Sequence, residues 1–291
     1  MNEGEALGII GASGCGKSTL LRTLMMLMEE NCQIDKGAVF FEETDLTKLS
    51  EKELRLLRGK DIVMIFQNAA LSSNPLHKIG HQFYETITSH SGKMSKKECY
   101  AKAEDILKKL KFKEPKRILN SYPFELSGGM NQRVALALAI LMNPKLILAD
   151  EPTSALDVTV QAQVIKQMRQ LRESYHTAML VVTHNMGVVA QLCDKVGVLY
   201  AGRIVEWGSV EDILEHPKHP YTQALISAIP EMNGEDPTGI PGSPKEFTKE
   251  EIGCDFAPRC TKAKENCACV VPEKVVLSDE HWALCPYCRE E

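Results

Sequence analysis

Eight consecutive residues near the start of the chain have the types and spacing needed to hold a phosphate. From Gly11 to Ser18 they read Gly-Ala-Ser-Gly-Cys-Gly-Lys-Ser. The glycines allow the backbone to wrap a phosphate with its N–H groups inward, and Lys17 would reach the β- and γ-phosphates of a nucleoside triphosphate. Ser18 would offer a hydroxyl to Mg²⁺. The predicted binding residues of this loop are Gly11, Ser13, Gly14, Cys15, Gly16, Lys17, Ser18 and Thr19.

Two adjacent carboxylates, Asp150 and Glu151, follow a continuously apolar segment at 146–149. At the C-terminal edge of a buried strand, beside a phosphate loop, Asp150 would hold the Mg²⁺ shell. Glu151 would polarise a water molecule against the γ-phosphate. Such a pair alone is common at the solvated end of a strand. Its combination with the loop at Gly11 favours the metal-and-base interpretation.

A second anion site is predicted where Ser127, Gly128 and Gly129 precede a helical segment. The free N–H groups and the dipole at a helix N-terminus attract an anion. The alternative is an ordinary N-cap with a flexible turn. A second phosphate site on one chain makes sense if it serves the nucleotide of another subunit.

The hydrophobic pattern predicts the scaffold that positions these residues. Continuous apolar segments, typical of strands buried on both faces, occur at 6–10, 62–66, 146–149 and 179–183. They alternate with amphipathic helical segments, including one from Lys17 and one over 158–171, which indicates an α/β fold with a mostly parallel sheet. Residues 68–133 are polar and helical in pattern. A capping box at 95–98 begins a helix there that we expect Pro115 to end.

Composition and charge exclude several classes of protein. The chain has 291 residues, enough for one large α/β domain and an appendage. A net charge of −5 and an isoelectric point near 6.0 argue against a protein that coats nucleic acid. The N-terminus lacks the basic and apolar regions of a signal peptide, and no apolar run is long enough to span a bilayer. We therefore expect a cytoplasmic protein.

Together with further positions, these motifs resemble the ATP-binding subunits of ABC transporters, a family of P-loop NTPases. The loop at 11–18 is similar to the Walker A motif, and 146–150 is similar to Walker B. The remaining motifs follow in the family's order: the Q-loop glutamine Gln67, the signature motif at 126–130, the catalytic glutamate Glu151, the D-loop at 154–157 with Asp157, and the switch histidine His184. The resemblance covers residues 3–210 and implies a nucleotide-binding domain over 1–210 with a helical subdomain at 68–133.

The resemblance also implies how ATP would be bound and hydrolysed. Lys17, Ser18 and Asp150 would hold Mg-ATP, and the signature residues of a second ATPase, facing head to tail, would cap the γ-phosphate. Glu151 would be the general base, and His184 would hold the γ-phosphate and the attacking water. Gln67 would reach the metal and transmit closure to the helical subdomain, which would press on a coupling helix of a membrane subunit.

The segment 211–291 differs in composition from the body and is predicted to be a C-terminal extension with a Pro/Gly-rich linker. Three motifs in it resemble the extension of oligopeptide and dipeptide importer ATPases: the first is at 219–225, the second at 240–244 and the third at 254–260. The implied partners are a second, paralogous ATPase, two transmembrane permeases and, indirectly, an extracytoplasmic solute-binding protein. The implied location is the inner face of the cell membrane, with peptides as the expected solute and nickel or another solute as the alternative.

Six of the ten cysteines crowd the last 38 residues. In a reducing compartment such a cluster more often marks a metal than disulfides. The spacing resembles family members whose extension carries a [4Fe–4S] cluster, and its four matching residues are Cys254, Cys260, Cys267 and Cys285. Zinc is the alternative, because Cys285 and Cys288 have the short spacing that zinc sites favour. Unligated thiols are the third possibility.

One departure from the family concerns the N-terminus. The Walker A motif normally follows antiparallel strands and an aromatic residue that stacks on adenine, and here the loop begins at residue 11. We expect those strands to be missing, through either a misassigned start or a naturally shortened subunit. Other ABC ATPases fit less well: DNA-repair ATPases need coiled-coil heptads, and translation factors need two ATP domains. A non-hydrolysing iron–sulfur or regulatory module remains a further alternative.

Overall fold

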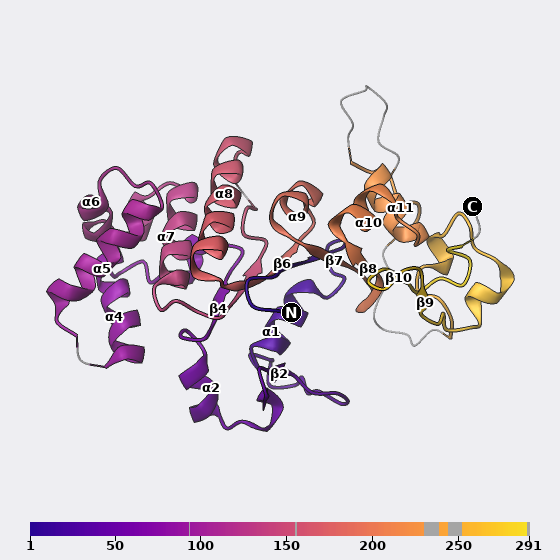
Figure 1. The fold of residues 1–291 in the computed structure, drawn as a ribbon, viewed down its shortest axis with the longest axis horizontal. Helices are drawn as coiled ribbons and strands as arrows, with labels where there is room; N and C mark the ends of the chain where they lie inside the picture. Colours follow the sequence, from indigo (N-terminus) through magenta and orange to yellow (C-terminus); the bar gives the residue numbers. More distant parts are fainter. Residues whose placement is uncertain (93, 155, 230–238, 244–251, 290–291) are drawn as a thin grey trace. The chain divides into compact units, whose positions relative to one another are not determined.

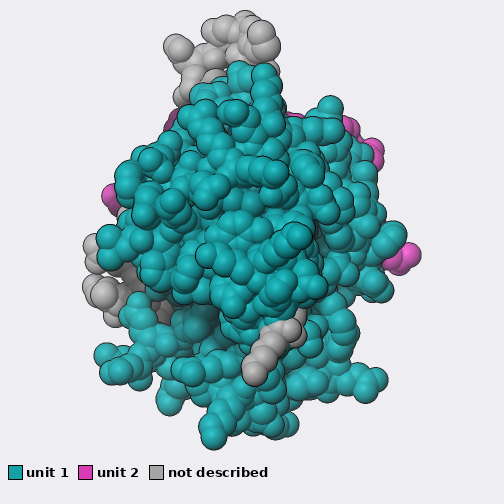
Figure 2. Space-filling view, turned by 90° about the vertical axis from the view of Figure 1, so that its left-hand side faces the viewer, with its two compact units in different colours: residues 1–6, 18–181 teal, residues 7–17, 182–291 magenta. Residues whose placement is uncertain are grey.

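The computed structural model describes residues 1–92, 94–154, 156–229, 239–243 and 252–289. Figure 1 shows the order of its helices and strands. The chain divides into two compact units, coloured separately in Figure 2: unit 1 comprises 1–6 and 18–181, and unit 2 comprises 7–17 and 182–291. Parts of the predicted linker, 230–238 and 244–251, lie outside the described residues.

Unit 1 contains three of the predicted strands. β4 (Ile62–Ile65), β5 (Leu146–Asp150) and β6 (Ala178–Thr183) are neighbours in that order, and β6 contributes its first four residues to this unit. β4 and β5 run parallel with Ile62 opposite Leu146. β6 is buried along its whole length and β5 along all but its first residue. β5 and β6 are thus covered on both faces, as the pattern predicts. β4 is not, because Val63 and Met64 are only half-buried and Phe66, which follows it, is exposed.

The helices of unit 1 follow the capping signals in the sequence. They are α1 (Lys17–Leu24), α2 (Glu51–Leu57), α3 (Ala69–Ser72), α4 (Ile79–Ser91), α5 (Lys96–Lys109), α6 (Pro115–Asn120), α7 (Gly128–Ile140) and α8 (Val158–Tyr175). The capping box of Ser95 and Glu98 begins α5 as predicted. The expectation that Pro115 ends this helix is wrong: α5 ends at Lys109, and Pro115 opens α6. Proline suits the first turn of a helix because its missing N–H has no intrahelical partner there.

α4 packs against α5, α6 and α7, which form the helical region that follows Gln67 (Figure 1). A two-stranded ribbon, β2 (Phe40–Phe41) and β3 (Thr44–Asp45), completes unit 1. The polar, helical pattern at 68–133 thus corresponds to α3, α4, α5, α6 and the beginning of α7.

Unit 2 joins the beginning of the chain to its end. Its strands lie in the order β1 (Ala6–Ile10), β7 (Lys195–Tyr200), β8 (Arg203–Ser209), β10 (Trp282–Ala283) and β9 (Val275–Val276). β1 and β7 are parallel, and the other neighbours are antiparallel. The helices are α9 (Met186–Leu192), α10 (Val210–Glu215) and α11 (Pro220–Ser227). The C-terminal extension therefore continues the sheet beyond β8.

A single hydrophobic cluster holds unit 2 together. It contains Ile10 from β1, Val198 and Tyr200 from β7, Tyr221 from α11 and Phe256 from the cysteine-rich segment. Residues about 200 positions apart are thus packed in one core. Burial of such large side chains stabilises a fold by about 1.5–3 kcal/mol each.

A buried carboxylate ties the extension to β8. Glu206 is fully buried and accepts hydrogen bonds from the backbone amides of Lys218 and His219, at 2.7 and 2.9 Å. The Nε2 atom of His281 lies 2.9 Å from the same carboxylate. A charge without water needs partners of this kind, so Glu206 fixes the start of α11 and the strand β10 onto β8. Among the described residues, no helix is both long and apolar enough to cross a lipid bilayer.

Candidate nucleotide site

The phosphate loop follows β1 directly, as predicted. At Gly11 an added Cβ would lie 2.2 Å from the carbonyl oxygen of Leu199, so no side chain fits at the point where the loop leaves the sheet. Gly14 has a φ of +79° and open space around its would-be Cβ position. A positive φ favours glycine, and the open space leaves the backbone accessible to a ligand. The loop therefore has the cradle shape that a phosphate needs.

The side chain of Lys17 folds back onto the backbone of this loop. Its side chain is only 7% exposed, and Nζ donates hydrogen bonds to the carbonyl oxygens of Gly11 at 2.8 Å and Ala12 at 3.0 Å. Burial raises the pKa of the Cys15 thiol, and the nearby Lys17 opposes that rise only in part. The loop thus presents a lysine ammonium beside a neutral thiol, which is a suitable environment for the phosphate oxygens of a nucleotide.

Tyr221 of the extension contacts the loop, a contact that the sequence analysis missed. Its hydroxyl oxygen accepts a hydrogen bond of 2.9 Å from the amide of Ala12. The ring is fully buried, with Tyr200 at 4.5 Å and Phe256 at 5.3 Å between ring centroids. Burial raises the pKa of Tyr221 to about 12, so the phenol stays protonated. The 209-residue separation leaves no local signal for this contact.

His184 lies at the end of β6, in unit 2, and is exposed. The residues before and after His184 are bonded to each other: the Thr183 hydroxyl accepts a hydrogen bond from the amide of Asn185 at 3.0 Å. Asn185 is also the N-cap of α9. These bonds fix the backbone at the end of the strand.

The remaining predicted ligands lie in unit 1. Ser18 and Thr19 are exposed in the first turn of α1. Asp150 ends β5 and is 8% exposed, whereas Glu151 adopts a left-handed φ of +47°. Such a backbone is strained for a residue with a side chain and often marks a functional position. Gln67 is exposed after β4, and its carbonyl oxygen accepts a 3.4 Å hydrogen bond from Ser154 of the predicted D-loop.

Ser127 and Asp157 act as helix N-caps in this structure. Ser127 accepts a hydrogen bond from the amide of Met130 at the start of α7, and Asp157 accepts one from Val160 at the start of α8. At Gly129 an added Cβ would lie 2.4 Å from a Val160 methyl group, so the two helix starts pack closely. Gly128 is exposed. The roles of these four residues toward a nucleotide remain predictions. Residue 155 of the predicted D-loop lies outside the described residues.

The residue types in each unit fit the groups that a nucleotide site needs. In unit 2, Gly11–Lys17 offer N–H groups and an ammonium to phosphate oxygens. In unit 1, Ser18 and Asp150 offer hard oxygen ligands. Oxygen ligands of this kind are those that Mg²⁺ prefers.

The cysteines of the extension surround a cavity of about 140 Å³ in unit 2. Five of them line it: Cys254, Cys260, Cys267, Cys285 and Cys288. Burial, together with the neighbouring Cys288 and Cys254 thiols, raises the pKa of Cys285 to about 11. The four cysteines predicted as ligands are therefore brought together, and Cys288 joins them although it had no place in the four-residue pattern. Cys269 is exposed.

Comparison with known families and proteins agrees with this architecture. Residues 1–154 match the ABC transporter family, and residues 205–267 match the C-terminal region of oligopeptide/dipeptide transporters. The oligopeptide transport ATP-binding protein OppD of Haemophilus influenzae is 44% identical over 92% of this chain and 83% of its own length. The dipeptide transport ATP-binding protein DppD of Bacillus subtilis is 38% identical over 97% of this chain and 85% of its own length.

A solved structure is similar as well. The ATP-binding cassette MJ0796, in a dimeric post-hydrolysis state bound to ADP and Pi, is 31% identical with a TM-score of 0.64 over 72% of this chain and 87% of the other. It supports the P-loop fold. The chain belongs to the ABC transporter ATP-binding proteins, in the subfamily that carries the C-terminal region of oligopeptide/dipeptide transporters.

Proposed function

We propose that this chain hydrolyses ATP to drive the import of oligopeptides or dipeptides. The observation that carries the proposal is the combination of a complete set of ATPase motifs with the peptide-transporter extension, found together in OppD and DppD relatives. A nickel importer would share the ATPase motifs, and for that reason the solute has to be tested directly.

The proposed chemistry gives each residue the role that its sequence motif implies. The loop amides and Lys17 bind the phosphates, Ser18 and Asp150 bind Mg²⁺, and Gln67 contributes a further metal ligand. Glu151 takes the proton of the attacking water, and His184 orients that water against the γ-phosphate. Bound Mg²⁺ supplies charge neutralisation at the phosphate oxygens. Ser127, Gly128, Gly129 and Asp157 complete the site of a second ATPase subunit.

We propose that the partner subunits are a paralogous ATPase, two permeases and a solute-binding protein, on the inner face of the membrane. The dimeric state of the similar cassette supports the ATPase pair. A groove of about 480 Å³ beside β4 and α4, lined by Phe66, Asn74 and Ala135 among others, is a suitable place for a permease helix. Co-purification with a second, different ATPase is expected. Isolation with copies of this chain alone would contradict the heterodimer.

We further propose that the cysteine cavity holds a [4Fe–4S] cluster, ligated by Cys254, Cys260, Cys267 and Cys285. A single zinc ion needs its thiolate sulfurs about 3.8 Å apart, since Zn–S bonds are about 2.3 Å long. Among the described cysteines, no three sulfurs lie within 4.8 Å of one another. A four-iron cluster is larger than one ion and takes thiolates that lie further apart. The proposal rests on the four cysteines that line one cavity.

Iron analysis and absorbance of anaerobically purified protein test this assignment. We expect stoichiometric iron and a broad band near ~400 nm, both lost in Cys260→Ser and both retained in Cys269→Ser, the exposed control. Stoichiometric zinc without iron would establish the alternative, and absence of both metals would leave only thiols.

Peptide uptake by the reconstituted complex tests the proposed function as a whole. Uptake and ATP hydrolysis are both expected with the wild-type chain, and both should fall by about 100-fold or more with Glu151→Gln because the general base is lost. ATP binding without peptide-dependent hydrolysis would indicate a regulatory module instead.

A further inference from the structure

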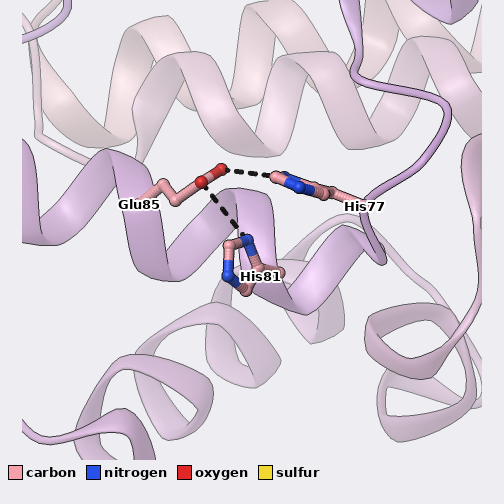
Figure 3. Close-up of side chains that lie close together, drawn as sticks. All are labelled: His77, His81 and Glu85. Atoms are coloured by element: carbon pink, nitrogen blue, oxygen red, sulfur yellow. Dashed lines mark ion pairs between the residues drawn. The ribbon is translucent and has the colours of Figure 1, made fainter.

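Two histidines and a glutamate form a compact cluster in the helical region of unit 1. His81 and Glu85 lie one turn apart on α4, and His77 lies in the loop just before this helix. Figure 3 shows the Glu85 carboxylate reaching toward both imidazole rings. The phosphate loop and the cysteines contribute nothing to this cluster, so neither the ATPase chemistry nor the extension accounts for it.

The distances within the cluster match those around a single metal ion. Glu85 Oε2 lies 3.5 Å from His77 Nδ1, and Glu85 Oε1 lies 3.4 Å from His81 Nδ1. One ligand atom from each residue lies within 4.8 Å of the others. In a tetrahedral site with bonds of about 2.0–2.1 Å, donor atoms are about 3.3 Å apart. A charge-assisted hydrogen bond would be shorter, at about 2.7–2.9 Å.

Both Nδ1 atoms are shielded from water and lack a hydrogen-bond partner. The histidine side chains are otherwise 40% and 45% exposed, and the glutamate side chain is 50% exposed. Both nitrogens lie at ion-pair distance from the Glu85 carboxylate, but neither makes a hydrogen bond that would replace the water it has lost. A metal ion between the three groups would satisfy both nitrogens at once.

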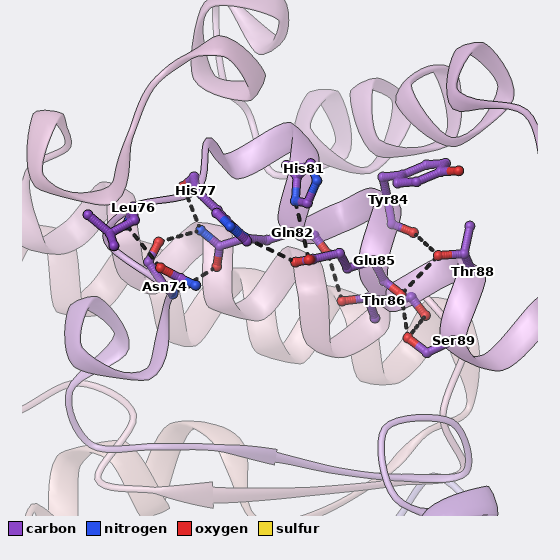
Figure 4. A network of polar contacts seen from close by, with 10 residues as sticks. All are labelled: Asn74, Leu76, His77, His81, Gln82, Tyr84, Glu85, Thr86, Thr88 and Ser89. Atoms are coloured by element: carbon purple, nitrogen blue, oxygen red, sulfur yellow. Dashed lines mark hydrogen bonds and ion pairs between the residues drawn. The ribbon is translucent and has the colours of Figure 1, made fainter.

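A network of hydrogen bonds fixes the loop that carries His77 (Figure 4). The Gln82 amide donates to the carbonyl oxygens of His77 at 3.0 Å and Asn74 at 3.1 Å, and its own oxygen accepts from the amide of Asn74. Gln82 is buried. The backbone that carries His77 is therefore held beside α4 before any ion arrives, which reduces the entropic cost of binding.

We propose that His77, His81 and Glu85 form a binding site for a divalent transition-metal ion of the zinc type, with one coordination position left open. Two imidazoles and one carboxylate suit zinc, cobalt or nickel, whereas magnesium and calcium prefer oxygen ligands alone. An occupied site would tie the loop after Gln67 to α4, at one edge of the groove that Glu85 also lines.

Titration of the full chain with Co²⁺ tests the proposal, because its absorbance distinguishes the two classes of ligand. Thiolate ligands of the extension give a sulfur-to-cobalt charge-transfer band, whereas nitrogen and oxygen ligands give only ligand-field bands. We expect a ligand-field component that Glu85→Gln and His81→Ala weaken by about tenfold or more. The matched control, His90→Ala on the same helix but outside the cluster, should bind as the wild type does.

Equal cobalt affinity in Glu85→Gln and wild type, or a wild-type spectrum with thiolate bands alone, would overturn the site. Glu85 is half exposed, so its amide variant is expected to fold, and the unfolding temperature without metal checks this. Loss of the ligand-field component with an unchanged thiolate band would separate the site from the cysteine cavity.

Discussion

The phosphate loop and the cysteine cavity belong to the same unit but differ in how they are built. The loop comes from consecutive residues, and its lysine is already bonded to loop carbonyls. The cavity gathers thiols from separate segments, and burial raises the pKa of Cys254 and Cys285. The loop is therefore formed before its ligand arrives, whereas the cavity contains half-buried thiols that a bound metal would satisfy.

The two sites are joined through one aromatic contact. Phe256 lines the cysteine cavity and packs against Tyr221, whose hydroxyl bonds the loop at Ala12. The extension therefore supports the phosphate loop and also holds the cysteines. The predictions that follow test this dependence, starting from the largest effect.

Replacement of Glu206 by alanine should break the attachment of the extension. Two backbone amides and His281 lose their buried partner, so we expect the free energy of unfolding to fall by about 3–5 kcal/mol. Urea unfolding of purified protein measures this. The exposed Glu215→Ala is the control and should change stability by less than about 0.5 kcal/mol. Equal stability of the two variants would show that Glu206 does not anchor the extension.

Lys17→Ala should disable the loop without affecting the extension. Removal of a preorganised cation from a phosphate site costs about 100- to 1,000-fold in turnover, so hydrolysis should be nearly lost. ATPase assays of the reconstituted complex measure the effect, and the metal content of the extension serves as the internal control. Hydrolysis within twofold of wild type would contradict the role of the loop.

Acid should destabilise the extension through His219. Burial lowers the pKa of this residue to about 4 from 6.5, and its Nδ1 accepts a hydrogen bond from the amide of Tyr221. Between these pH values the unfolded chain binds a proton that the folded chain excludes. The contribution of neutral His219 to the free energy of unfolding is therefore complete above pH ~6.5. It is lost as the pH falls toward ~4, and the total loss is about 3 kcal/mol.

Urea unfolding across this pH range checks the effect against His219→Asn. Asparagine offers an oxygen at the same N-cap position but does not titrate. The difference in stability between wild type and variant should change with pH in the direction given. A pH-independent difference would show that His219 does not titrate in this way.

The sequence predicted those features that depend on neighbouring residues. The strand before the loop, the start of α7 after Ser127 and the capping box at Ser95 each need only a few positions, and all are present. Pro115 was misjudged because proline both ends helices and begins them.

Contacts between distant segments could not be predicted. The bond between Tyr221 and Ala12 spans 209 residues, and Cys288 reaches the cavity only through the fold of the extension. Histidines 77 and 81 have a helical spacing, but His77 precedes the helix, so spacing alone did not indicate a cluster.

The most direct test of this account is Mg-ATP binding to the full chain carrying Glu151→Gln, with and without Tyr221→Phe. The glutamine blocks turnover, and binding in the micromolar range, about −8 kcal/mol, is expected. Removal of the tyrosine hydroxyl leaves the half-buried Ala12 amide unbonded, so affinity should fall about tenfold. Identical affinities in two folded proteins would contradict the claim that the extension supports the phosphate loop.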